Sequence, residues 1–139
     1  VIHESLRMCP PGASTGRMAM RDVEVDGYRI PAGTNTVVGI YALHHDPSLW
    51  DEPEKFDPDR FAPGRSVDRS RWQYLPFGGG PRTCIGDHFA MLEAILGLAS
   101  VVRELCVESL HDDFPVKTPF TLIAAGPVPA RVQGRASAA

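Results

Sequence analysis

Between Asp87 and Leu105 runs a segment whose apolar side chains leave it almost no polar face. Its apolar residues are Phe89, Met91, Leu92, Ile95, Leu96, Leu98, Val101 and Val102. A helix that is apolar all round is buried inside a large protein rather than lying on its surface. The segment is too short to span a bilayer, and Glu93, Gly97 and Ser100 interrupt it. We therefore expect a buried helix whose packing partners lie partly outside this chain.

The composition is that of a globular protein rich in loops. Of 139 residues, 43% are hydrophobic and 22% are charged, which excludes disorder by composition. Thirteen prolines and thirteen glycines predict long ordered loops between few regular elements. By its pattern, the chain is expected to be α+β with long ordered loops.

The first half of the chain predicts one helix and a small sheet. Helical character over residues 1–9 stops at Cys9-Pro10-Pro11-Gly12, since proline lacks the amide that a helix needs. We expect loop from there to Asp22. Strands 23–25 and 28–30 flank Asp26-Gly27, a turn that requires positive φ angles, and residues 34–39 form a third strand.

The rest of the chain predicts one short helix, a meander and a β-rich tail. Residues 40–45 are expected to be helical before Asp46-Pro47, and residues 53–76 to form an ordered meander. The tail from Cys106 to Val132 alternates and contains several prolines, which predicts two or three short strands. Residues 134–139 are expected to be a loose end.

Charge and cysteine usage exclude some classes of function. A net charge of −3, with no basic run, argues against binding to nucleic acid or to an anionic membrane surface. Three widely spaced cysteines, with no CxxC pair, favour free thiols in a reducing compartment, so we expect a cytoplasmic protein. Residue 1 is Val, in what looks like the later part of a helix, so we expect a fragment; a membrane anchor elsewhere in the parent stays open.

The segment from Phe77 to Gly86, just before the apolar helix, has a composition suited to holding an anionic sulfur. Three consecutive glycines let the backbone approach a flat ligand and aim amides at one point. The positive end of the following helix dipole stabilises a thiolate at Cys84, and Gly86 leaves room for a planar group.

Three other interpretations of this segment stay open on residues alone. Cys84 could be a buried apolar residue beside an ordinary loop. A phosphate loop would need a Gly-Lys-Ser/Thr ending and a preceding strand, which the sequence lacks. A zinc site could use His88, but two ligands are not four.

The segment resembles the Phe-x-x-Gly-x-Arg-x-Cys-x-Gly loop of the cytochrome P450 haem-thiolate monooxygenases at every fixed position. The resemblance implies that Cys84 is the axial iron ligand and that Arg82 contacts a haem propionate. It also implies that Phe77 packs by the sulfur and that Gly80 and Gly86 shape the loop. The family's fold is mainly α with small β-sheets, and residues 1–139 would be the C-terminal, haem-proximal third of a single domain.

Two further motifs resemble that family and appear in the right order. Glu4-Ser5-Leu6-Arg7 is similar to its Glu-x-x-Arg helix, and Pro58-Asp59-Arg60-Phe61 to its Pro-x-Arg-Phe motif. The resemblance implies a buried structural triad of Glu4, Arg7 and Arg60. Arg17 stands where the family often carries a second propionate-binding arginine; a solvated loop arginine is the alternative. The residues His44-His45-Asp46-Pro47 are expected to serve turns and packing rather than metal ligation.

The resemblance implies a haem-dependent monooxygenase that inserts one oxygen atom of O2 into a small apolar organic substrate. The cofactor would be haem b, with electrons from NAD(P)H delivered through a ferredoxin or flavin reductase. No residue of this chain is assigned as catalytic. Two alternatives stay open: a peroxide-driven enzyme, and a non-catalytic piece unable to hold haem alone. Asp87-His88 departs from the basic or amide residue that the family often has after the loop, which leaves the donor's docking charge open.

Overall fold

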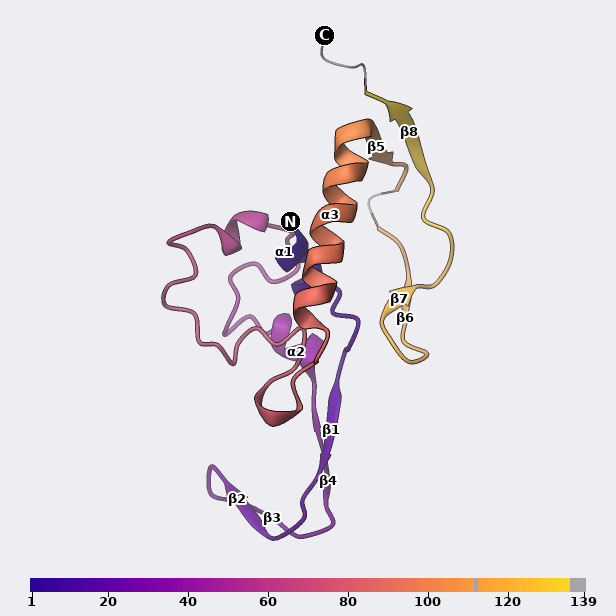
Figure 1. The fold of residues 1–139 in the computed structure, drawn as a ribbon. Coiled ribbons are helices and arrows are strands. Elements are labelled where there is room, and N and C mark those ends of the chain that lie inside the picture. Colours follow the sequence, from indigo (N-terminus) through magenta and orange to yellow (C-terminus); the bar gives the residue numbers. More distant parts are fainter. Residues whose placement is uncertain (112, 136–139) are drawn as a thin grey trace.

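The computed structural model describes residues 1–111 and 113–135. Its α-helices are α1 (Ile2–Met8), α2 (Ile40–His44) and α3 (Asp87–Glu104), and its 3-10 turns are η1 (Pro58–Phe61) and η2 (Gly80–Arg82). Figure 1 shows the long α3 beside α1, with the meander on the other side of α1. Helices and small antiparallel sheets together make the α+β architecture that the sequence predicts.

Within the described residues, eight short strands form four separate antiparallel pairs. The strand β1 (Thr15–Met18) pairs with β4 (Asn35–Val38), and β2 (Val23–Val25) pairs with β3 (Tyr28–Ile30). In the tail, β5 (Leu105–Ser109) pairs with β8 (Ala130–Gly134), and β6 (Val116–Lys117) pairs with β7 (Ile123–Ala124). The pair β1–β4 extends away from the helices and carries the β2–β3 hairpin at its far end (Figure 1).

Local signals in the sequence are confirmed. The helix α1 ends before Pro10, and the Cys9 amide closes its last turn on the Ser5 carbonyl. At the hairpin, Asp26 has φ 50° and Gly27 φ 79°, the positive angles that the turn requires. The short helix at residues 40–44 is also present.

Elements that depend on distant pairing differ from the prediction. Residues 15–18, expected to be loop, form β1, because their hydrogen-bonding partner is β4, some twenty residues on. The part of the tail that the structure describes has four strands rather than two or three. Gly134 pairs with Leu105 and the Arg135 amide donates to the Glu104 carbonyl, so the expected loose end is tied down at its start. Residues 136–139 lie outside the described residues.

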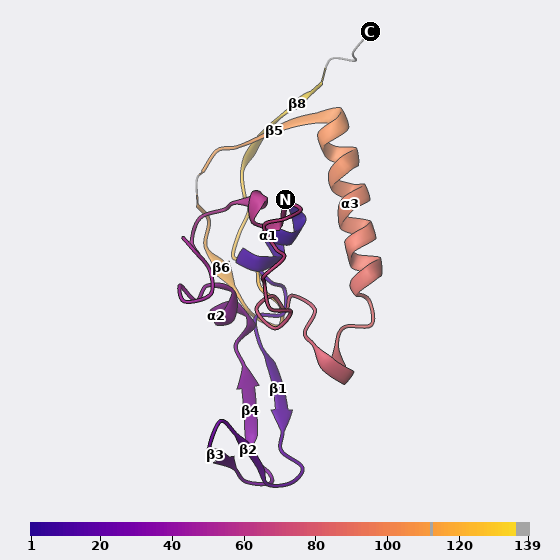
Figure 2. The same cartoon turned by 90° about the vertical axis from the view of Figure 1, so that its left-hand side faces the viewer.

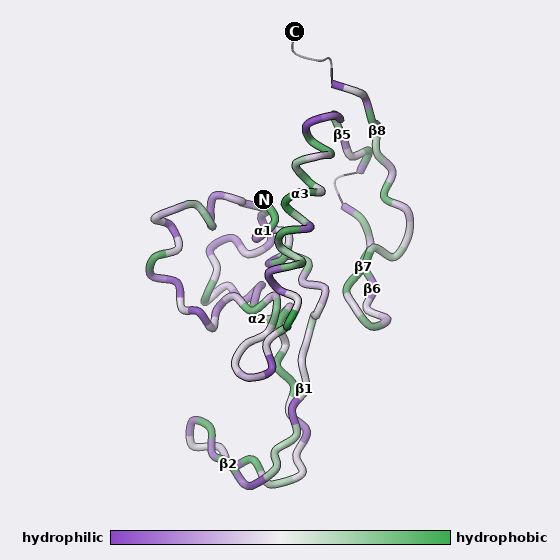
Figure 3. Tube along the Cα trace, in the orientation of Figure 1, coloured by the Kyte–Doolittle hydropathy of each residue, from purple (hydrophilic) through white to green (hydrophobic). Residues whose placement is uncertain are grey.

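The helix α3 is not covered by the rest of the described chain. Figure 3 shows apolar stretches along it, and Figure 2 shows it to one side of α1, joined to β5 at its C-terminal end. None of its residues is buried; Phe89 is 71% exposed and Leu96 is 58% exposed. The described part of this chain therefore does not bury α3. Packing of α3 against segments beyond the chain stays a prediction.

The most buried part of the described chain is polar. Among the described residues, the buried apolar ones are Pro10, Ile40 and Trp50, whereas the charged or polar Glu4, Arg7, His44 and Arg60 are all buried. They lie where α1 meets α2 and η1. Buried charges persist only when they are paired and hydrogen-bonded, so these contacts determine how the three elements are arranged.

The carboxylate of Glu4 binds both arginines of the expected triad. Its Oε2 accepts from Arg7 Nε at 2.8 Å and its Oε1 from Arg7 Nη2 at 2.9 Å. The Nε of Arg60 lies 3.3 Å from Oε1, and the Asp57 amide donates to the same oxygen at 3.0 Å. Burial alone would raise the pKa of Glu4, but the Arg7 and Asp57 hydrogen bonds and the two arginine charges together lower it.

The arginines extend this network to the meander and to α2. Arg7 Nη1 donates to the His44 carbonyl at 2.8 Å, and Arg60 Nη2 donates to the Glu52 carbonyl at 2.8 Å. A third arginine, Arg69, donates to the Arg60 carbonyl at 2.7 Å. Its guanidinium lies 4.7 Å from the Trp50 ring centre, a cation–π contact over the same core.

Replacing Glu4 with Gln in the protein that contains this chain removes the one charge that compensates two buried arginines. Breaking such a buried network from one side costs about 3–5 kcal/mol of unfolding free energy. Denaturant titration measures this loss. The matched control is Glu52→Gln, because the Glu52 side chain forms an exposed ion pair with Lys55 and is 62% exposed. Equal stability of the two variants would contradict a structural role for Glu4.

Candidate functional site

The loop that carries Cys84 is held by hydrogen bonds within itself. The Cys84 amide donates to the Phe77 carbonyl at 2.8 Å, and the Thr83 hydroxyl donates to the same carbonyl at 3.2 Å. The Thr83 amide donates to the Gly80 carbonyl at 3.1 Å. Gly80 has φ +73°, a conformation that favours glycine. The loop thus closes on itself and presents Cys84 just before α3.

Four of the sequence-predicted residues line one hollow of about 470 Å³: Arg17, Phe77, Arg82 and Cys84. Arg17 comes from β1 and Arg82 from η2. Phe77 begins the cysteine loop, and Cys84 stands two residues before Gly86. Apolar side chains of Ile40, Pro76 and Ala90 complete much of the wall. Residues nearly seventy positions apart in the sequence therefore face the same space.

The two arginines are placed differently within the hollow. Arg82 ends the 3-10 turn that leads into Cys84. Arg17 lies on β1, where its Nη1 donates to the Thr15 hydroxyl at 2.8 Å and to the Gly16 carbonyl at 2.7 Å. Those local bonds leave other guanidinium hydrogens free for an acceptor in the hollow, since arginine carries five donors. The sheet pairing of β1, which the sequence did not reveal, is what brings Arg17 to the site.

The two predicted glycines shape the loop without lining that hollow. Gly80 begins η2, and a Cβ added there would meet nothing within 4 Å, so its requirement is its positive φ. Gly86 precedes α3, and a Cβ there would lie 3.8 Å from the Cys84 sulfur. A side chain larger than methyl at position 86 would therefore crowd the sulfur.

The donors around the hollow are those that a haem requires. A thiolate is a haem-iron ligand, and two guanidiniums suit the two propionates, which they can bind bidentately. Apolar walls suit the macrocycle. Within the described residues, no group of three or more His, Cys, Asp or Glu could hold a metal ion without such a cofactor, which leaves the zinc interpretation without ligands.

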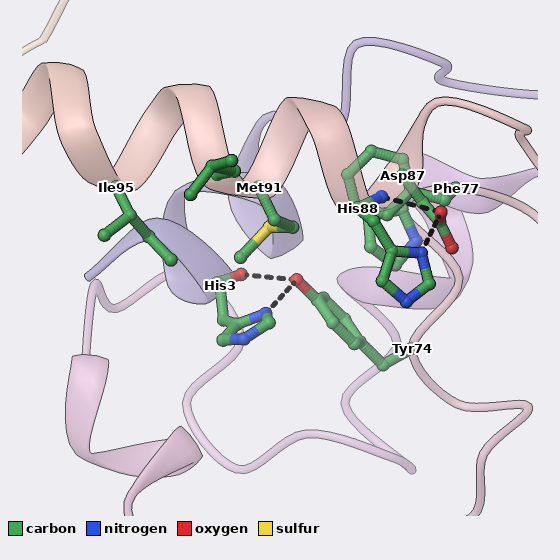
Figure 4. Close-up of a pocket in the computed structure, with 9 residues that line it drawn as sticks. His3, Tyr74, Phe77, Asp87, His88, Met91 and Ile95 are labelled. Atoms are coloured by element: carbon green, nitrogen blue, oxygen red, sulfur yellow. Dashed lines mark hydrogen bonds and ion pairs between the residues drawn. The ribbon is translucent and has the colours of Figure 1, made fainter.

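A second hollow, of about 400 Å³, lies on the other side of Phe77 between α3 and the start of α1 (Figure 4). The Tyr74 hydroxyl donates to the His3 carbonyl at 3.0 Å, and burial raises the pKa of Tyr74, so the phenol keeps its proton. Asp87 accepts from the His88 amide at 2.6 Å and lies the same distance from the His88 ring Nδ1. The acid that departs from the family pattern is thus paired with its own neighbour.

His44 connects the buried charge network to the cysteine loop, a role that the sequence did not indicate. Its ring Nδ1 lies 3.2 Å from the Arg7 carbonyl, and its Nε2 accepts from the Leu75 amide at 2.9 Å. The Leu75 carbonyl in turn accepts from the Gly78 amide at 2.9 Å. Burial lowers the pKa of His44 to about 4, so the ring is neutral near pH 7.

The chain matches the family model described as Cytochrome P450 over residues 1–133. It is 47% identical over 109 residues to thromboxane-A synthase of Sus scrofa, covering 78% of this chain and 20% of that protein. It is 41% identical over 118 residues to cytochrome P450 3A31 of Mesocricetus auratus, covering 84% and 24%. It is 38% identical over 128 residues to cyclooctatin synthase of Streptomyces melanosporofaciens, covering 92% and 28%.

A solved structure gives the same result at the level of the fold. The retinoic acid-bound cyanobacterial CYP120A1 superposes with a TM-score of 0.89 at 29% identity, covering 96% of this chain and 31% of that one. The chain therefore spans between a fifth and a third of the length of these relatives. Among the described residues, no helix is both long and apolar enough to cross a membrane.

The buried neutral state of His44 predicts a pH dependence of stability. The unfolded ring binds a proton below its ordinary pKa of 6.5, whereas the folded ring does so only near 4. As pH falls from 6.5 to 5, unfolding therefore takes up a proton and stability decreases, with a slope approaching about 1.4 kcal/mol per pH unit. His44→Phe removes this contribution, so the midpoint of denaturation should vary less with pH across that window.

The control for that measurement is His88→Phe, because the His88 side chain is 99% exposed. It should keep the slope of the unaltered protein. The window stops at pH 5 so that protonation of Glu4, whose pKa lies below its ordinary value of 4.5, does not contribute. An unchanged slope in His44→Phe would contradict the assignment.

Proposed function

The chain belongs to the cytochrome P450 family, and we propose that it forms the proximal half of the haem site of a monooxygenase, with the Cys84 thiolate as iron ligand. One observation carries this proposal: Cys84, Arg82 of the same loop and Arg17 of the distant strand β1 line a single, largely apolar hollow. A cysteine that served only packing would not need those guanidiniums beside it.

The cofactor would be haem b, whose iron, when bound to a thiolate, supplies the chemistry of O2 activation and O–O cleavage. The role of this chain is to hold and orient that group. The folded loop fixes the Cys84 backbone through the hydrogen bond from its amide to the Phe77 carbonyl, so the backbone that carries the sulfur is in place before any ligand arrives. Such preorganisation keeps the geometry of a site within narrow limits.

Arg82 and Arg17 would bind the propionates. A charge-assisted hydrogen bond between guanidinium and carboxylate is about twice as strong as a neutral one, and its planar geometry fixes orientation. Phe77 lines the hollow with Cys84 and supplies an apolar surface beside the sulfur, while Gly80 and Gly86 give the loop its path. Glu4, Arg7 and Arg60 serve the fold, because all three lie away from this hollow and are buried with one another.

The family supports the reaction that we propose: insertion of one oxygen atom of O2 into a small apolar organic substrate, with electrons from NAD(P)H through a ferredoxin or flavin reductase. The relatives of this chain are similar to it in this haem-proximal part, yet they carry names as different as thromboxane-A synthase and cyclooctatin synthase. Since this part is shared among them, it supports the reaction class, and the substrate would be selected elsewhere in the protein.

Replacing Cys84 with His in the protein that contains this chain tests the ligand directly. The reduced protein with carbon monoxide should show the thiolate-shifted Soret band, and Cys84→His should move that band to the position of a histidine-ligated haem and abolish monooxygenation. Cys106→His is the matched control, because Cys106 is exposed on β5, paired with Gln133. A thiolate-shifted band that persists in Cys84→His would contradict the proposal.

A further inference from the structure

Gly79, the middle glycine of the cysteine loop, is required for a different reason from its neighbours. Its φ of −159° and ψ of 163° describe extended backbone that any residue adopts. A Cβ there would nevertheless lie 2.9 Å from Cζ3 of Trp72 and 3.3 Å from Cδ2 of Leu75. Gly78 and Gly80 show the reverse, with φ of +73° and no atom within 4 Å of an added Cβ. Position 79 is thus constrained by space rather than by backbone conformation.

The indole that occupies this space is 54% exposed, and the segment that carries it is bonded to the core. The Arg71 guanidinium lies 4.7 Å from the centre of the Trp72 ring. The next residue, Gln73, donates from its side-chain amide to the Leu49 carbonyl. Two residues further, the Leu75 amide donates to the buried His44 ring. The backbone that carries Trp72 is therefore fixed to the core, and the indole rests on the cysteine loop.

The point of contact lies between Phe77 and Gly80, whose carbonyls bind the end of the loop at Cys84 and Thr83. The Phe77 carbonyl accepts from the Cys84 amide at 2.8 Å, and the Gly80 carbonyl accepts from the Thr83 amide at 3.1 Å. Gly79 is in the stretch that sets the separation of these two acceptors. A shift of the backbone at Gly79 changes both bonds, because each depends on the path of residues 77–80.

Trp72 also stands between two hollows. One, of about 340 Å³, is lined by Arg71, Tyr74 and Thr83; the other, of about 310 Å³, by Thr15, Arg17 and Val38. Trp72, Leu75, Gly78 and Gly79 line both. The indole and Gly79 thus form part of the wall of both hollows, and the second hollow also contains the proposed propionate ligand Arg17.

We propose that Trp72 is a positioning residue for the cysteine loop, acting through its contact with Gly79, and that position 79 must be glycine because Trp72 is there. The functional part of this inference rests on the proposed thiolate ligation by Cys84. Trp72 itself does not line the hollow that contains Cys84, so its effect passes through the loop.

The test is a double-mutant cycle in the haem-loaded protein that contains this chain, using Gly79→Ala, Trp72→Ala and the two combined. Gly79→Ala alone should reduce the fraction of haem with the thiolate-shifted carbon monoxide band on the order of fivefold, the coupling typical of residues in direct contact. Adding Gly79→Ala to Trp72→Ala should cost little further, because the indole atoms at 2.9 and 3.5 Å are then gone and only Leu75, at 3.3 Å, remains near the added Cβ.

Gly80→Ala provides the contrast within the same loop. Its penalty comes from a positive φ, which does not depend on Trp72. The combination of Trp72→Ala with Gly80→Ala should therefore be as poor as Gly80→Ala or worse. A loss caused by general damage to the loop would add to the effect of Trp72→Ala at both positions, whereas the proposal predicts that the effects fail to add at position 79 alone.

Two outcomes overturn the proposal: a normal band in Gly79→Ala, or the same loss from Gly79→Ala whether or not Trp72 is present. Amide hydrogen exchange at Thr83 and Cys84 gives a readout that needs no haem, and it should accelerate in Gly79→Ala and in Trp72→Ala. Were Cys84 not the iron ligand, the unaltered protein would lack the thiolate-shifted band, yet the pattern of exchange would still decide the role of Trp72.

Discussion

The rest of this structure depends on the contacts of one group, the carboxylate of Glu4. It is fully buried, lies within 3.3 Å of guanidinium nitrogens of both Arg7 and Arg60, and accepts the amide of Asp57. None of these charges can be left unpaired away from water without a large penalty. The first helix, the second helix and the meander are therefore held in one arrangement by a polar core; among the described residues, the buried apolar ones are Pro10, Ile40 and Trp50.

From that core a continuous series of hydrogen bonds reaches the loop that carries the cysteine. Arg7 is bonded to both the carbonyl and the ring of His44, and the ring accepts from the Leu75 amide. The Leu75 carbonyl then accepts from Gly78, the second residue of the loop. This series of hydrogen bonds explains how a triad remote from the hollow can affect the geometry of the hollow. The triad fixes the surface on which the cysteine loop is folded, and the loop positions Cys84.

Sequence reasoning succeeded where the chemistry is local. The Asp26-Gly27 turn, the end of the first helix before Pro10, and the ten-residue cysteine loop all follow from residues close together in the chain. It failed where the partner is distant: β1 was expected to be loop, because nothing near Arg17 reveals its pairing with β4. The role of His44 was also missed, since a histidine gives no sign in sequence that both its nitrogens will find buried partners.

X-ray absorption at the iron edge of the protein that contains this chain tests the central claim most directly, because it identifies the atoms bound to the metal without relying on activity. Thiolate ligation by Cys84 predicts one sulfur in the first coordination shell, lost in Cys84→His and retained in Cys106→His. A first shell of nitrogen and oxygen alone in the unaltered protein, or a sulfur that persists without Cys84, would contradict the account.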